Sequence, residues 1–190
     1  MLDAMEIARE RLGKLQGRYQ LAHGMFIADE DTARFAEHDL TVEFSPVLWF
    51  PNLLNNVVFA MVSPERAARY FPMRSVADAG ARVVIASDGP LYLQTPVASF
   101  ETAVTRRPPE GGPKNPSIGE AITLKEAIAS RTINAAYLAF AEDELGSIET
   151  GKLADFIVLD RDLFAIPIDE ISEAQVLKTV VKGEVVYEAE

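Results

Sequence analysis

The sequence predicts an α/β fold in which parallel strands alternate with helices, followed by a small β module. Residues 83–86 are four apolar residues without a polar interruption, which is typical of a strand buried on both faces of a parallel sheet. Helix-like segments separate this strand from two earlier strand-like segments, residues 18–23 and 40–44. Beyond Glu142 the composition changes, and β-type runs follow one another.

The first half of the chain contains three predicted helices. Residues 1–16 place apolar side chains at helical spacing, and Gly17 ends this amphipathic segment. Residues 29–38 begin with acidic side chains, which favour the positive end of a helix dipole. Residues 72–80 form a third helix that leads into the strand at 83–86. The order strand, helix, strand therefore occurs twice.

The second half begins with a helix over residues 94–105. Residues 106–116 contain four prolines and two glycines in eleven residues, which predicts a loop. This loop is either a mobile lid or a solvated connection, and the second interpretation is favoured. Residues 123–130 begin with a capping-box spacing, and a further helix covers residues 132–140.

The last fifty residues contain three β-type runs. They are residues 155–159, 176–181 and 184–187, and the last two flank a Lys-Gly pair that predicts a hairpin. Three short strands cannot enclose a sizeable core by themselves. We therefore expect this module to pack against other parts of a fold.

Composition restricts the classes of partner. The chain has 190 residues and a formal net charge of −11, which argues against nucleic acid or an anionic membrane as a partner. The absence of cysteine excludes disulfides, thiolate metal sites and cysteine nucleophiles. The first residues are acidic and lack a long apolar run, so we expect neither a signal peptide nor a membrane span. A soluble, cytoplasmic protein is predicted.

Two residues at strand ends are candidates for chemistry. Asp88 follows the buried strand and precedes Gly89-Pro90, and functional groups of parallel α/β folds gather at that end of the strands. An aspartate that caps a turn is the alternative. His23 holds the equivalent place after residues 18–22, although a structural histidine is the commoner case. His38 ends a helix, and this position is sufficient to explain it.

Three motifs resemble one family, the amidohydrolase superfamily and its family 3 branch, which includes N-substituted formamide deformylase-like enzymes. Residues 17–23 resemble the sixth strand of the family's barrel, which ends in a metal-binding histidine. Residues 86–90 resemble the eighth strand, which ends in an aspartate. Residues 145–160 look very like the family's return into its β-sandwich, and residues 132–136 fit the usual segment before it.

The resemblance implies a fold and a site. It implies the last three strands of a TIM-type (β/α) barrel with their helices in residues 1–141, followed by β-sandwich strands in residues 142–190. His23 and Asp88 would be ligands of a divalent metal, with zinc first among the candidates, and Asp88 would also act as the base. Arg74 would contact an anionic or carbonyl group of a small-molecule substrate, unless it is an ordinary exposed helical arginine.

The resemblance also implies that the site is incomplete. Family members carry a His-x-His pair, but this chain has two histidines, fifteen residues apart. It therefore looks like the carboxyl-terminal part of a hydrolase of amide, formamide or cyclic amide bonds, with little or no activity alone. Open sheet edges predict a homo-oligomer or assembly with a separate amino-terminal chain. A non-catalytic interaction or scaffold protein is the main alternative, and an unrelated small ligand-binding domain is a third.

Overall fold

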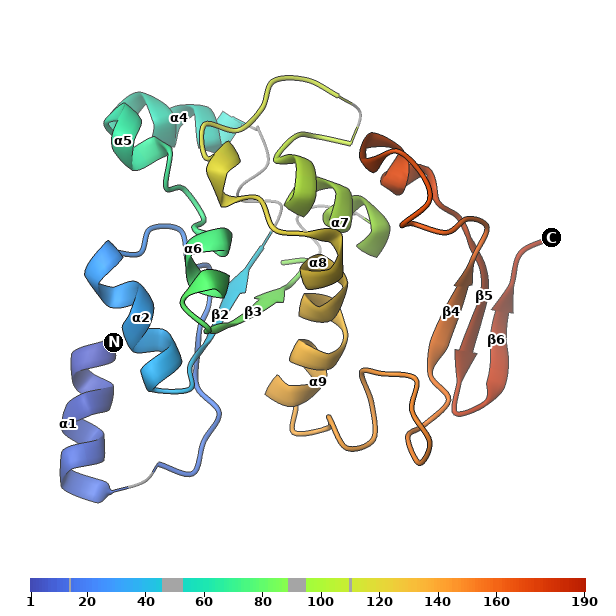
Figure 1. Cartoon of the computed structure of the whole chain (residues 1–190), viewed down its shortest axis with the longest axis horizontal. Helices are drawn as coiled ribbons and strands as arrows, with labels where there is room; N and C mark the ends of the chain where they lie inside the picture. Colours follow the sequence, from blue (N-terminus) through green and yellow to red (C-terminus); the bar gives the residue numbers. More distant parts are fainter. Residues whose placement is uncertain (14, 46–52, 89–94, 110) are drawn as a thin grey trace.

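The described residues form two three-stranded sheets, one parallel and one antiparallel, with helices packed around the first (Figure 1). The computed structural model describes residues 1–13, 15–45, 53–88, 95–109 and 111–190. The predicted α/β arrangement with a later β module is confirmed. Gly89 and Pro90, which belong to the motif after the third strand, lie outside the described residues.

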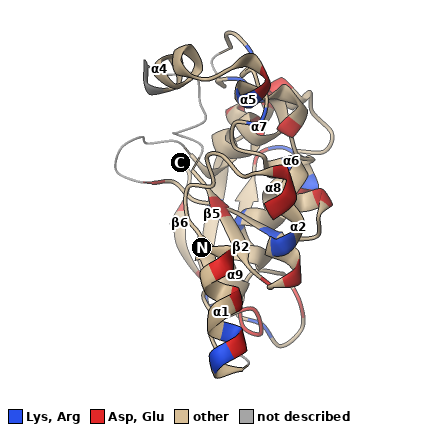
Figure 2. Cartoon of the chain, turned by 90° about the vertical axis from the view of Figure 1, so that its left-hand side faces the viewer, with Lys and Arg blue, Asp and Glu red and all other residues tan. Residues whose placement is uncertain are grey.

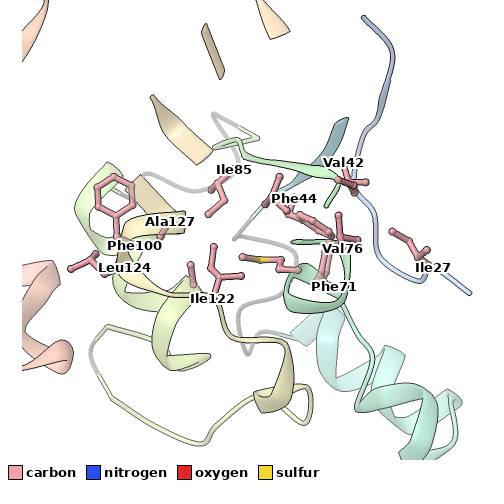
Figure 3. Close-up of a cluster of buried hydrophobic side chains, with 14 of the residues drawn as sticks. Ile27, Val42, Phe44, Phe71, Val76, Ile85, Phe100, Ile122, Leu124 and Ala127 are labelled. Atoms are coloured by element: carbon pink, nitrogen blue, oxygen red, sulfur yellow. The ribbon is translucent and has the colours of Figure 1, made fainter. Parts of the chain in front are cut away.

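The parallel sheet has the order β1-β2-β3, with β2 in the centre. α2 connects β1 to β2, and α4, α5 and α6 lie between β2 and β3 in the chain. One face of β2 supplies Val42 and Phe44 to the core, where they pack with residues of α6 and β3 (Figure 3). The elements of this part are α1 (Leu2–Leu12), β1 (Gln20–Leu21), α2 (Asp29–Glu37), β2 (Thr41–Phe44), α4 (Leu53–Met61), α5 (Pro64–Ala67), α6 (Met73–Asp78) and β3 (Arg82–Ile85).

The same core continues into the second half of the chain. α8 packs against β3, α7 packs against α8, and η2 packs against α7. The fully buried Ile171 of η2 belongs to one cluster with Phe100 and Ile85. Buried Glu101 of α7 accepts a hydrogen bond from the Ser172 N–H at 2.7 Å. The elements are α7 (Pro96–Thr105), η1 (Ile118–Glu120), α8 (Leu124–Arg131), α9 (Ile133–Leu138), β4 (Phe156–Leu159), η2 (Ile168–Glu173), β5 (Val176–Val181) and β6 (Glu184–Glu188).

The antiparallel sheet exposes much of its apolar surface. Its order is β4-β5-β6, and the predicted hairpin between β5 and β6 is confirmed. Aliphatic and aromatic side chains of all three strands are exposed. Apolar patches of this kind usually contact a partner. They are Phe156, Ile157, Val158, Leu177, Val181, Val185, Val186 and Tyr187.

The first helix is shorter than predicted. The apolar spacing extends to Leu15, but α1 ends at Leu12 because Gly13 adopts a φ of 74°. Glycine takes this left-handed conformation without the steric cost of a Cβ atom, and it commonly terminates helices. The predicted end at Gly17 was therefore wrong by about one turn of helix.

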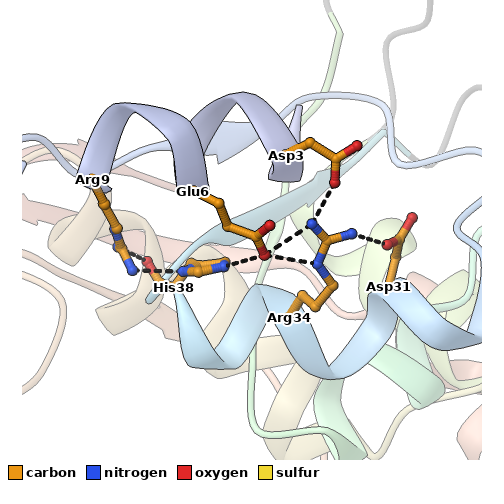
Figure 4. Close-up of polar contacts among 6 residues, drawn as sticks. All are labelled: Asp3, Glu6, Arg9, Asp31, Arg34 and His38. Atoms are coloured by element: carbon orange, nitrogen blue, oxygen red, sulfur yellow. Dashed lines mark hydrogen bonds and ion pairs between the residues drawn. The ribbon is translucent and has the colours of Figure 1, made fainter. Parts of the chain in front are cut away.

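Polar contacts join α1 to α2, and both helices carry charges of both signs (Figure 2). The Arg34 guanidinium pairs with the carboxylates of Asp3, Glu6 and Asp31 (Figure 4). These hydrogen bonds raise the pKa of Arg34. His38 also contacts α1, so its place at the end of α2 is only part of its explanation.

The proline-rich segment is exposed over residues 111–114, as in a solvated connection, but it is buried at Arg106 and Asn115. Arg106 is 1% exposed, and its guanidinium donates to the Tyr70 carbonyl at 2.8 Å and to the Ser117 hydroxyl. Burial lowers the pKa of Arg106 to about 9. Asn115 is also buried and accepts from the Ser117 hydroxyl at 2.8 Å, whereas residues 111–114 are exposed. The segment is therefore anchored by a buried guanidinium that a surface loop would not contain.

Candidate functional site

The carboxyl ends of the three parallel strands meet at one edge of the sheet. Gln20 pairs with Thr41 and Thr41 pairs with Arg82, so the strands run in step. His23 comes two residues after β1, and Asp88 comes three residues after β3. Both predicted site residues therefore lie beyond the same edge, which is the arrangement expected of a functional site in parallel α/β folds.

Both residues have an unusual backbone conformation. The φ angle is 53° at His23 and 49° at Asp88, within the left-handed region. Residues other than glycine rarely occupy this region, at a cost of roughly 1–2 kcal/mol each. Such strained positions occur preferentially at functional sites, where surrounding contacts hold them. Five other non-glycine residues among those described, Phe140 and Lys182 included, share this conformation, so the φ angles alone do not mark His23 and Asp88 as functional.

Two further polar residues of this edge lie on β2 and directly after it. Glu43 and Ser45 are buried, with Ser45 completely inaccessible. The Ser45 hydroxyl donates to Glu43 Oε1 at 2.7 Å, and His23 Nδ1 lies 3.1 Å from Ser45 Oγ. The His23 backbone N–H donates to Glu43 Oε2 at 3.2 Å. The structure thus joins His23 to a buried carboxylate that sequence reasoning did not select.

A signal for Glu43 and Ser45 exists in the strand alternation. Successive side chains of a strand point to opposite faces, so Val42 and Phe44 share the core face while Glu43 takes the other face. A buried carboxylate on a central strand is unusual unless it is paired. Knowledge that β1 lies beside β2 was needed to identify His23 as its partner.

Arg74 lies on α6, and carboxylates surround its guanidinium. Its Nη1 and Nη2 donate to the two carboxylate oxygens of Glu126 on α8, at 2.8 and 2.6 Å. Its Nε lies 2.9 Å from Asp78 Oδ1. The Arg74 hydrogen bonds lower the pKa of Glu126 to about 2. A structural ion pair therefore accounts for the position of Arg74, and its contact with a substrate stays a prediction.

Within the part of the chain that the structure describes, histidine and carboxylate side chains do not form a complete metal site. A catalytic zinc site usually has three protein ligands and one open position. Among residues 1–13, 15–45, 53–88, 95–109 and 111–190, no three histidine or carboxylate side chains are grouped so as to hold a metal. His23 and Asp88 would supply two of the three protein ligands that such a site usually needs.

The sequence profile of the amidohydrolase family matches residues 1–187 of this chain. The chain belongs to the amidohydrolase family. The resemblance drawn from the three motifs is thereby confirmed. The chain is 37% identical over 190 residues to N-substituted formamide deformylase of Arthrobacter pascens. This alignment covers 99% of the chain and 34% of that protein.

Two more comparisons show a similar sequence and a similar fold. The chain is 31% identical over 194 residues to Protein LONG AFTER FAR-RED 3 of Arabidopsis thaliana, covering 98% of this chain and 32% of that protein. A metal-dependent hydrolase of Pyrococcus horikoshii superposes with a TM-score of 0.70 at 22% identity, covering 87% of this chain and 32% of that one. This amidohydrolase chain therefore spans about a third of the length of the relatives that it matches.

Among the described residues of the chain, no helix is long and apolar enough to cross a membrane.

Proposed function

We propose that this chain is the carboxyl-terminal part of a metal-dependent amidohydrolase that cleaves a non-peptide C–N bond in an amide, formamide or cyclic amide. The observation that carries the proposal is the placement of His23 and Asp88 beyond one edge of the parallel sheet. The similarity to a formamide deformylase along 99% of this chain supports the same class of bond.

The proposed architecture has two parts. Residues 1–141 would be the last three strands and helices of a TIM-type (β/α) barrel, and residues 142–190 would be strands of a small β-sandwich. The parallel β1-β2-β3 order with helices between the strands supports the first part. The antiparallel β4-β5-β6 sheet supports the second. In the barrel, Glu43 and Ser45 would face inward.

The chemistry of this chain's own residues is limited to binding and proton transfer. In a complete family site, a divalent metal such as zinc supplies hydroxide near neutral pH. Asp88 would take a proton from the attacking water and give it to the leaving nitrogen. Together with Asp88, His23 would hold the metal, and it would orient the water. Arg74 stays a candidate for contact with a small-molecule substrate. Because further ligands must come from elsewhere, the isolated chain would be inactive.

Association would complete the site. The exposed apolar side chains of β4, β5 and β6 would be covered in a homo-oligomer or in a complex with a separate amino-terminal chain. Within the described residues, β1 and β3 each pair with one neighbour only and so offer open edges. The net charge of −11 favours neither nucleic acid nor an anionic membrane as partner, and it fits a cytoplasmic location.

A non-catalytic scaffold is the second candidate function. The described residues include no group of three possible metal ligands, and association alone needs no metal. The two candidates differ in whether an assembled complex binds metal through His23 and Asp88. Metal content therefore separates them before any substrate is known.

The experiment measures zinc, iron and manganese by elemental mass spectrometry in the purified chain and in its complex with an amino-terminal amidohydrolase segment. Light scattering gives the oligomeric state of each sample. His23→Ala and Asp88→Asn are the test variants, and His38→Gln controls for loss of a histidine elsewhere. Near-stoichiometric metal that both test variants lose and the control keeps would support the hydrolase. Absence of metal from both samples, with the complex formed, would overturn it in favour of the scaffold.

A further inference from the structure

The hydrogen-bond chain from Glu43 through Ser45 to His23 determines where the imidazole proton must lie. A serine hydroxyl has one hydrogen to donate and two lone pairs to accept with. The Ser45 hydroxyl gives its hydrogen to Glu43 Oε1, which as a carboxylate oxygen can only accept. Ser45 Oγ must therefore accept in its contact with His23 Nδ1 at 3.1 Å. This requires a hydrogen on Nδ1.

We infer that Glu43 and Ser45 are positioning residues that hold the neutral His23 ring in the Nδ1–H tautomer and leave the Nε2 lone pair for the chemistry of the site. The inference rests on the proposed function, because it takes His23 to be part of a hydrolytic site. Histidines that bind metals or accept protons are commonly oriented in this way by a carboxylate behind the ring. Here a buried serine transmits the effect.

The same carboxylate also holds the strained backbone of His23. Glu43 Oε2 accepts from the His23 N–H at 3.2 Å, while Oε1 binds Ser45. Glu43 therefore fixes both the main chain and, through Ser45, the ring. Glu43 is 9% exposed in its side chain and His23 is 44% exposed, so the oriented ring borders solvent while its support is shielded. A buried carboxylate can impose a fixed geometry that a solvated one would not.

His38 provides an internal reference because its surroundings require the opposite tautomer. The Arg9 guanidinium, which can only donate, lies with Nη1 2.7 Å from His38 Nδ1. His38 Nδ1 must therefore carry the lone pair, and its Nε2–H donates to Glu6 Oε1 at 3.1 Å (Figure 4). The chain contains these two histidines and no others. Each tautomer should thus be present once in the same sample.

The experiment is a long-range ¹⁵N–¹H correlation spectrum of the uniformly ¹⁵N-labelled chain, recorded above pH 8, where an ordinary imidazole is neutral. It shows directly which ring nitrogen carries the hydrogen, and His38→Gln assigns the two signals. We expect Nδ1–H at His23 and Nε2–H at His38. An Nε2–H tautomer or a rapidly exchanging mixture at His23 in the unmodified protein would overturn the inference.

Substitutions then test the two supporting residues. Ser45→Ala and Glu43→Ala should each replace the single His23 tautomer by an exchanging mixture and leave the His38 signal unchanged. Thr41→Ala is the matched control, because Thr41 is buried on the same face of β2 but outside the chain of bonds. A retained Nδ1–H signal in both test variants would show that other groups orient the ring. The spectra need no metal, so this outcome is independent of the metal-content experiment.

Discussion

Arg74→Ala tests whether the guanidinium is structural, through its ion pair with Glu126. The two parallel hydrogen bonds at 2.8 and 2.6 Å form a bidentate pair, the strongest geometry for such groups. The side chains are 26% and 38% exposed, so solvent screening keeps their contribution to the free energy of unfolding at about 1 kcal/mol. Arg74→Ala should therefore lower that free energy by about 1 kcal/mol at pH 7.

Glu126 has a second role that a double-mutant cycle separates. Its Oε2 also accepts from the Thr123 N–H at 2.8 Å in the capping box of α8. Glu126→Ala should therefore cost about 2 kcal/mol, with about 1 from the cap and about 1 from the pair. In the Glu126→Ala background, Arg74→Ala should then cost only the ~0.3–0.5 kcal/mol of its i,i+4 ion pair with Asp78. The coupling free energy from the cycle is about 1 kcal/mol.

The assay is urea unfolding followed by circular dichroism, at pH 7 and at lower pH. Hydrogen bonds, first from Arg74 and then from Thr123, lower the pKa of Glu126 from 4.5 to about 2 in the folded chain. A carboxyl group whose pKa is lower in the folded state stabilises that state at every pH above the pKa of the unfolded chain, about 4.5. This contribution is lost as the pH falls from about 4.5 through about 2. The difference between the parent chain and Arg74→Ala should shrink over that range. An unchanged free energy of unfolding for Arg74→Ala at pH 7 would refute the structural role and favour the substrate contact.

Three further substitutions test other parts of the structure by urea unfolding. A Cβ at Gly24 would lie 2.6 Å from Val42 Cγ1, so Gly24→Ala should cost ~1–3 kcal/mol by overpacking beside His23, and a neutral result would contradict the placement of β1 against β2. Glu101→Ala should cost ~1–3 kcal/mol because it leaves the Ser172 N–H unpaired, whereas Glu101→Gln keeps an acceptor and should cost less. Thr123→Ala removes the side-chain cap of α8 and should cost about 1 kcal/mol, and equal stability would show that the cap is not formed in solution.

The sequence predicted those elements whose signals are local. The capping-box spacing at Thr123 and Glu126 places the start of α8, because both hydrogen bonds join residues three apart. The apolar run at 83–86 predicted a buried strand of the parallel sheet, and β3 is that strand. The positions of His23 and Asp88 followed from the same argument, since strand ends can be located without knowledge of distant contacts.

Features that depend on contacts between distant segments were missed. The Arg106 side chain is buried against the Tyr70 carbonyl, 36 residues earlier in the chain, so the local composition gave no indication of its burial. Glu43 was assigned to a strand without any role, because its partner His23 lies after a neighbouring strand, β1. Local composition describes backbone preference, whereas burial of a polar group depends on whether the fold supplies a partner for it.

The arrangement at His23 has a consequence for the two candidate functions. Holding this residue at a φ of 53° costs roughly 1–2 kcal/mol, and the hydrogen bond from its N–H to Glu43 offsets part of that cost. These contacts lie within β1, β2 and the residues that follow them, so the ring is oriented without any ligand. Orientation of His23 is therefore expected in an active complex and in a scaffold alike. What distinguishes them is whether an assembled partner adds the remaining ligands beside a ring that is already oriented.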